Sequence, residues 1–102
     1  MALIDEVAFS LTRMESVTDT NLLTEFNGYI NAAIYDLTRT TDIKPFTALE
    51  ADDLQKRAII LYAHYCFELD VSRKDAYKKS YDDLKMQLAM SSEYSTLGAA
   101  TT

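Results

Sequence analysis

The chain has 102 residues and a formal net charge of −6, with 48% hydrophobic and 25% charged residues. This length is that of one small domain, and this balance of residues is typical of a folded protein rather than a disordered one. The acidic charge disfavours stable binding to nucleic acid, and a single cysteine excludes an intramolecular disulfide bond.

Two further features bear on the fold class and on localisation. Only two glycines and one proline occur, which is too few for the tight turns of a β-rich fold and favours a few long helices. No apolar run approaches the roughly 20 residues that span a bilayer, and MALIDEVAF carries acids where a signal peptide carries bases. We therefore expect an all-α cytosolic protein, a small bundle of about four helices without membrane association.

The first two helices are predicted from apolar residues that recur at helical spacing. In the first helix these residues are Leu3, Ile4, Val7, Ala8, Leu11 and Met14. A loop over residues 16–19 follows, and Asp19 or Thr20 can cap the second helix. That helix is long, and its apolar stripe ends at Leu37, before the polar residues 38–42.

A capping box predicts the start of the third helix, because Thr47 and Glu50 have the required three-residue spacing. The apolar stripe then runs to Leu69 and is broad enough to require cover on more than one side, which indicates a central helix. Ser72 can cap a fourth helix that forms a hairpin with the third. Residues 1–90 thus form the helical domain, and we expect the small polar tail 91–102 to be mobile in the free protein.

The stretch AIILYAHYCFELD contains the histidine, the cysteine and two acids. His64 and Glu68 share a helix face and can offer two ligands to zinc, but Cys66 lies roughly 200° from His64 around the helix. We therefore favour a structural interpretation, in which His64 is a partly buried residue or makes an interhelical hydrogen bond, and Cys66 fills apolar space. A metal-dependent enzyme that uses His64 and Glu68 is the less favoured alternative.

Other catalytic patterns are weak or missing in the sequence. The pairs Asp52–Asp53 and Asp82–Asp83 diverge on a helix and are interpreted as solvated faces. No glycine-rich phosphate loop occurs, and the isolated Gly28 and Gly98 form no backbone cradle. We expect no enzyme activity, no metal and no cofactor.

Four tyrosines lie in the predicted hairpin: Tyr62, Tyr65, Tyr77 and Tyr81. They admit two interpretations, a tyrosine-rich rim of the core or an interface with another subunit or partner. The sequence leaves both open.

The order of elements resembles that of the head–tail connector, or adaptor, proteins of tailed bacteriophages. The likeness runs from about Leu3 to Met90, and the third helix of that family typically reads "lkqAillLvahwYEnR". The residues that follow this pattern are Leu54, Gln55, Lys56, Ala58, Ile59, Ile60, Leu61, Ala63, His64, Tyr65 and Glu68. The arginine that often follows the glutamate is replaced here by Leu69 and Asp70.

The resemblance implies a structural virion protein without catalysis. Its subunits would assemble in the host cytoplasm and occupy the head–tail interface of the virion as a ring, commonly of about twelve copies. The ring would lie between the portal protein and a stopper or tail-completion protein, with DNA passing through unbound. Acidic residues along a channel would repel phosphates, in agreement with this role.

Candidate contact residues follow from this reading. In the tail, Glu93, Tyr94 and Leu97 are expected to bind the portal. In the loop 38–46, Asp42, Lys44 and Phe46 are candidates for subunit or partner contacts, with a plain solvent loop as the alternative. A different class of function also stays open, a monomeric helical binding module or small regulator that uses the face of the third and fourth helices.

Overall fold

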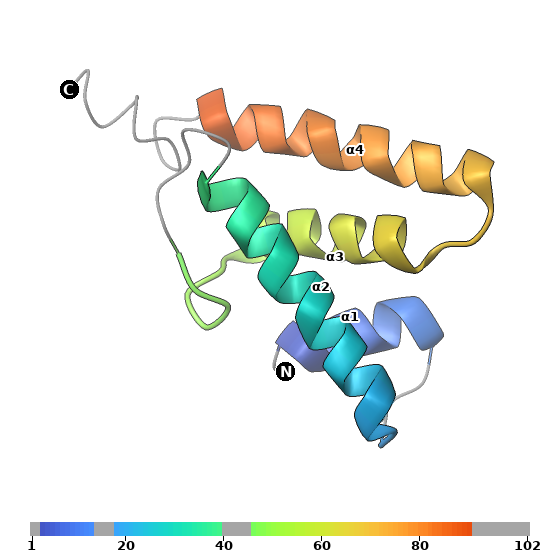
Figure 1. Cartoon of the computed structure of the whole chain (residues 1–102). Helices are drawn as coiled ribbons and strands as arrows, with labels where there is room; N and C mark the ends of the chain where they lie inside the picture. Colours follow the sequence, from blue (N-terminus) through green and yellow to red (C-terminus); the bar gives the residue numbers. More distant parts are fainter. Residues whose placement is uncertain (1–2, 14–17, 40–45, 91–102) are drawn as a thin grey trace.

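The computed structural model describes residues 3–13, 18–39 and 46–90 and contains four helices (Figure 1). They are α1 (Leu3–Thr12), α2 (Thr20–Arg39), α3 (Asp53–Phe67) and α4 (Val71–Met90). These residues contain no β-strand, so the prediction of an all-α fold is confirmed. No helix in this part of the chain is long and apolar enough to cross a membrane.

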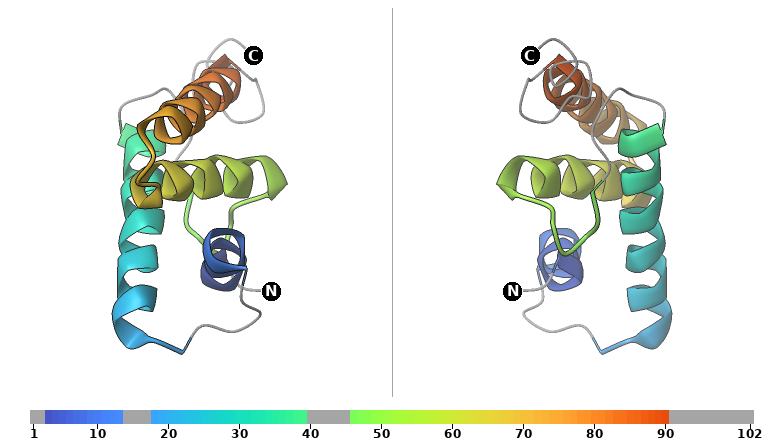
Figure 2. Two further views of the ribbon diagram at one scale, coloured as in Figure 1. Left: turned by 90° about the vertical axis from the view of Figure 1, so that its right-hand side faces the viewer. Right: turned by 90° about the vertical axis from the view of Figure 1, so that its left-hand side faces the viewer.

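Helix α3 is the central element, as its broad apolar face predicts. It packs against each of the other three helices and forms an antiparallel hairpin with α4. In Figure 2, α1, α3 and α4 stack one above another, and α2 runs along one side of this stack. One side of α3 is therefore covered by α2, and its flanks face α1 and α4.

The core lies where α1, α2 and α4 meet α3. Its buried apolar residues are Leu3, Val7, Ala8, Phe26, Ile30, Ala33, Leu37, Ala51, Ala58, Ile59, Ala63, Tyr81, Leu84 and Leu88. The fully buried alanines, Ala33, Ala58 and Ala63, let helices approach closely, because a methyl group occupies little space between them. Phe26 fills the space beside them, with its ring edge-on to that of Phe67 at a centroid distance of 5.6 Å.

Helix α2 begins where the sequence predicts, whereas α3 begins later than predicted. The Asp19 carboxylate accepts from the backbone N–H groups of residues 21 and 22 and caps α2. Helix α3 begins at Asp53, five residues later than predicted, behind a capping box made by Asp52 and Gln55. The predicted box at Thr47 forms only in part: Glu50 Oε1 accepts from the Thr47 N–H within an isolated turn.

Helix α4, in contrast to α3, begins earlier than predicted. Asp70, rather than Ser72, supplies the cap, with its carboxylate 3.1 Å from the backbone nitrogen of Arg73. Helix α3 ends at Phe67, because Glu68 adopts an extended backbone conformation. Leu69, which the sequence assigned to the apolar stripe of α3, lies instead in the connection and is exposed.

Candidate partner interface

Three of the four hairpin tyrosines form a contiguous aromatic cluster. The Tyr62 ring packs edge-on against Tyr81 at 5.2 Å and against Tyr65 at 6.1 Å between centroids. Burial raises the pKa of the Tyr62 phenol, and the neighbouring Cys66 raises it by a smaller amount. This cluster joins α3 to α4 and adds contact area beyond that of the aliphatic core.

Tyr81 belongs to the core, which is one of the two interpretations left open above. Its side chain is 1% exposed, and its hydroxyl donates to Asp36 Oδ2 of α2 at 2.5 Å. Lys85 Nζ bonds to the same oxygen at 3.0 Å. Burial, together with the Asp36 carboxylate, raises the pKa of Tyr81 far above its usual range. Tyr81 therefore offers no surface to a partner and ties α4 to α2.

Tyr65 lies at the surface of the hairpin among lysines. It is half-buried, and the Lys74 and Lys78 ammonium groups stand 5.3 Å and 5.9 Å from its ring centroid. Lys78 also donates to both carboxylate oxygens of Asp82, which raises the pKa of Lys78. Tyr65 keeps an accessible edge, so it fits either role that the sequence allowed.

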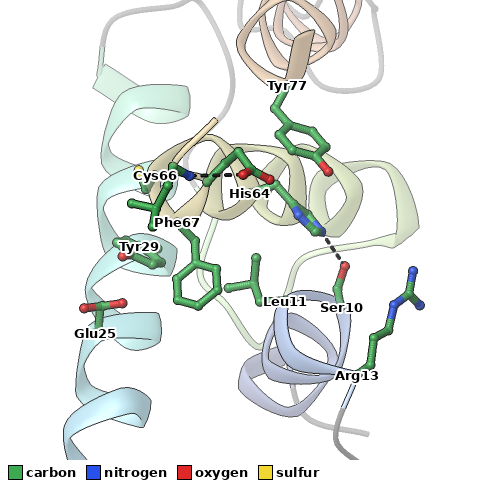
Figure 3. Close-up of a pocket in the computed structure, with 11 residues that line it drawn as sticks. Ser10, Leu11, Arg13, Glu25, Tyr29, His64, Cys66, Phe67 and Tyr77 are labelled. Carbon is green, nitrogen blue, oxygen red and sulfur yellow. Dashed lines mark hydrogen bonds between the residues drawn. The ribbon is translucent and has the colours of Figure 1, made fainter. Parts of the chain in front are cut away.

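Tyr77 lies apart from this cluster and stacks on His64, with ring centroids 4.7 Å apart (Figure 3). His64 Nε2 and Ser10 Oγ are 2.7 Å apart, so the imidazole links α3 to α1 as well as to α4. Burial lowers the pKa of His64, and the Arg13 guanidinium lowers it by a smaller amount. Both effects favour the neutral ring. The structure shows both forms of the structural role predicted for His64, since the residue is partly buried and makes an interhelical hydrogen bond.

A pocket of about 660 Å³ opens beside His64 at the end of α3. It is lined by Ser10, Leu11, Arg13, Glu25, Tyr29, His64, Cys66, Phe67, Glu68, Leu69 and Tyr77. Figure 3 shows His64 directed toward α1 and Cys66 on the opposite side, toward α2, as their spacing predicts. No group of three or more His, Cys, Asp or Glu side chains in the described part of the chain could hold a metal ion.

Burial favours the protonated form of two ionisable groups in this pocket, Cys66 and Tyr29. Burial raises the pKa of the Cys66 thiol and so favours its protonated form. A protonated thiol is a much weaker nucleophile than a thiolate. Burial and the Glu25 carboxylate raise the pKa of Tyr29 to about 12, which keeps that phenol neutral. His64 contacts Ser10 in this pocket and links α3 to α1.

A smaller pocket of about 350 Å³ lies on the other side of the His64–Tyr77 pair. Glu6 Oε2 of α1 and Lys56 Nζ of α3 are 3.3 Å apart there, and both side chains are partly exposed. Glu6 Oε2 makes no hydrogen bond with the residues described, so this contact is an ion pair without hydrogen-bond geometry. A partly exposed pair of this kind adds little stability.

Of the other predicted contact residues, the structure describes Phe46 alone. Phe46 is half-buried and packs against the core. Asp42 and Lys44 of the loop lie outside the described residues, and so do the tail residues Glu93, Tyr94 and Leu97. The sequence did not predict the contacts that Asp36 makes with Tyr81 and Lys85. In the sequence, Asp36 is one acid beside the apolar stripe of α2.

Comparison of the chain with protein-family models, with curated proteins and with solved structures finds no significant match.

Proposed function

We propose that the protein is a subunit of the head–tail connector of a tailed bacteriophage. In this proposal, copies of the chain form a ring below the portal protein and above a stopper or tail-completion protein. The ring extends the DNA channel toward the tail and performs no catalysis. The virion is its final location, after assembly in the host cytoplasm.

The observation that carries the proposal is the likeness of the α3 sequence to the third-helix pattern of the connector family. The order of the helices along the chain resembles that of the family as well. The apolar positions of the family pattern include Ala58, Ile59 and Ala63, which are fully buried here. The pattern therefore coincides with the residues by which a central helix packs against its neighbours. A likeness at such positions supports a shared arrangement of helices, from which the function is inferred.

The charge and the size of the chain support the same proposal. A net charge of −6 suits a conduit, because acidic surfaces repel phosphates and let DNA slide without binding. A small subunit with one cysteine has no disulfide of its own and gains stability from neighbouring subunits.

Co-expression with the portal protein of the same genome tests the proposal. The chain should co-purify with a tagged portal, and electron microscopy should show it as an added ring on the tail-facing side. Mass spectrometry of purified virions should detect it in stoichiometric amounts with the portal. Absence from both the complex and the virion would refute the proposal.

A truncation at Met90 tests the role proposed for the tail residues Glu93, Tyr94 and Leu97. The truncated chain should keep its helical circular dichroism, because α4, the last of the four helices, ends at Met90. It should lose attachment to the portal. Undiminished attachment would show that the portal contact lies elsewhere.

A monomeric binding module is the second candidate, and the surroundings of Tyr65 favour it. An accessible aromatic edge between Lys74 and Lys78 can contact an acidic partner through both apolar and charged groups. This alternative expects a stable one-to-one complex with another protein and no ring on the portal.

A further inference from the structure

Ser10 and His64 bring a hydroxyl and an imidazole into direct contact in the larger pocket. Ser10 Oγ lies 2.7 Å from His64 Nε2, and both side chains are half-buried. The hydroxyls of Thr12, Thr24 and Thr38 donate to the carbonyl four residues earlier in their own helix, which is a common local bond of this residue type. The Ser10 hydroxyl is directed to a different helix, so its contact with His64 depends on the tertiary structure.

A serine hydroxyl beside an imidazole nitrogen is the arrangement by which proteins activate an otherwise weak nucleophile. The separation of Ser10 Oγ and His64 Nε2 lies within the range of about 2.6–3.2 Å over which a general base takes a proton. Nε2 accepts from the hydroxyl when the proton of the neutral ring is on Nδ1, and this is the tautomer that a base requires. Burial lowers the pKa of His64, so the neutral ring predominates at pH 7.

The imidazole of His64 is held from two sides. Tyr77 of α4 stacks on the ring at a centroid distance of 4.7 Å and an interplanar angle of 29°, and Ser10 of α1 meets its Nε2. The negative charge of Glu68, one turn further along α3, opposes the effect of burial and raises the pKa of His64. The same charge stabilises the imidazolium that forms when the ring takes a proton.

Arg13 places a positive charge beside the hydroxyl. It lines the same pocket, and Figure 3 shows its side chain extending alongside Ser10. The guanidinium is close enough to His64 to lower the pKa of the imidazole. A positive charge in this place can stabilise the negative charge that develops on a carbonyl oxygen when the hydroxyl attacks the carbonyl carbon.

The pocket has room for a small molecule next to this contact. Its volume of about 660 Å³ is within the range of small-molecule sites. Figure 3 shows Leu11 and Phe67 between Ser10 and Glu25, so the middle of the pocket is apolar. Glu25 and Glu68 line the pocket with negative charges, which disfavour an anionic ligand. A short, uncharged ester fits these surroundings best.

We propose that Ser10 is a nucleophile, activated by His64 as a general base, that accepts an acyl group from a short uncharged ester with a good leaving group. Ser10 Oγ attacks the carbonyl carbon of the ester, and the hydroxyl proton passes to His64 Nε2. The bond from the carbonyl carbon to the leaving oxygen then breaks, and that oxygen takes the proton from the imidazolium. The products are O-acyl Ser10, an alcohol and the neutral His64.

This reactivity goes beyond the connector role and does not depend on it. One acyl group stays on each chain, so the step is a single modification rather than a catalytic cycle. Cys66 lines the same pocket but lies toward α2, away from the contact between Ser10 and His64, and is not used in this step.

Acetylation of the full-length protein by p-nitrophenyl acetate at neutral pH tests the proposal. Intact-mass spectrometry counts the acetyl groups on each chain, peptide mapping locates them, and the release of p-nitrophenolate gives the rate. Ser80, an exposed serine of α4, is the reference within the same molecule. Ser80→Ala is the matched control for Ser10→Ala.

We expect Ser10 to be acetylated about 100-fold faster than Ser80 in the folded protein, because a positioned general base contributes roughly 10²–10⁴-fold. Ser10→Ala should abolish this reaction, and Ser80→Ala should leave its rate unchanged. His64→Gln keeps a polar side chain beside Ser10 but has no basic nitrogen, so it should slow the acetylation of Ser10 about 100-fold. Circular dichroism checks that each variant is folded.

Two results would overturn the inference. Equal acetylation of Ser10 and Ser80 in the folded wild type would show that His64 does not activate the hydroxyl, and this comparison needs no variant. Acetylation of Ser10 at the wild-type rate in a folded His64→Gln protein would show that the contact is only structural. Neither result bears on the co-purification with the portal, which decides the proposed function separately.

Discussion

Tyr81→Phe removes one hydroxyl from the link between α4 and α2, and its effect on stability can be worked out from the structure. The hydroxyl donates to Asp36 Oδ2 at 2.5 Å from a side chain that is 1% exposed. A hydrogen bond to a charged acceptor contributes about 1.5–3 kcal/mol. Asp36 is partly exposed and keeps Lys85, so water and the ammonium replace part of the loss. We expect a decrease of about 1–2 kcal/mol in the free energy of unfolding at pH 7.

The pH dependence of this difference provides a second, independent readout. The pKa of Tyr81 is raised in the folded state by burial and by Asp36, so folding favours the protonated phenol. Its contribution is fully present below the unfolded pKa of about 10 and is lost as the pH rises from there toward the folded pKa. The loss amounts to about 1.4 kcal/mol per pH unit above that point. The wild type should therefore lose more stability than Tyr81→Phe between pH 10 and 11.

Urea unfolding followed by far-ultraviolet circular dichroism measures both effects. For a protein of this size, a loss of 1–2 kcal/mol shifts the urea midpoint by about 1 M, with an unchanged slope. Tyr65→Phe is the matched control, because it keeps the ring contacts with the lysines and should change stability by less than about 0.5 kcal/mol. A Tyr81→Phe protein with the stability of the wild type at pH 7, or with the same loss above pH 10, would refute the reasoning.

Three further predictions concern the caps, the core and the histidine. Asp52→Ala should lower the free energy of unfolding by about 1 kcal/mol and Thr47→Ala by much less, since Asp52 caps α3; equal losses in urea unfolding would contradict the observed helix start. Phe26→Ala should cost about 3–5 kcal/mol and lower the thermal midpoint, and a loss below 1 kcal/mol would show that the site around Phe67 is loosely packed. Because the pKa of His64 is lowered, the stability of the wild type should fall as the pH drops below about 6.5, and His64→Gln should flatten this dependence in thermal unfolding; an unchanged profile would rule out His64 as the cause.

Local periodicity determined much of this fold from the sequence alone. The all-α class, the central position of α3 and the hairpin with α4 follow from apolar spacing and from the scarcity of glycine and proline. The divergence of His64 and Cys66 follows from the same helical geometry, because it depends only on residues two apart in sequence.

Helix starts depended on competition between nearby caps, which the tertiary structure decided. Thr47 and Asp52 both precede apolar residues at suitable spacing, as do Asp70 and Ser72. In both cases the aspartate became the cap, and Ala51 became a buried core residue ahead of α3. Differences of about 1 kcal/mol separate such alternatives, which is within the reach of packing.

The roles of the individual tyrosines were decided only by the packing of distant segments. Tyr81 meets Asp36 across 45 residues, and His64 meets Ser10 across 54. Four tyrosines of one hairpin look alike in the sequence, yet Tyr81 is buried and Tyr65 keeps an accessible edge. Burial depends on which helix covers each face, and this is a property of the assembled bundle rather than of any local sequence pattern.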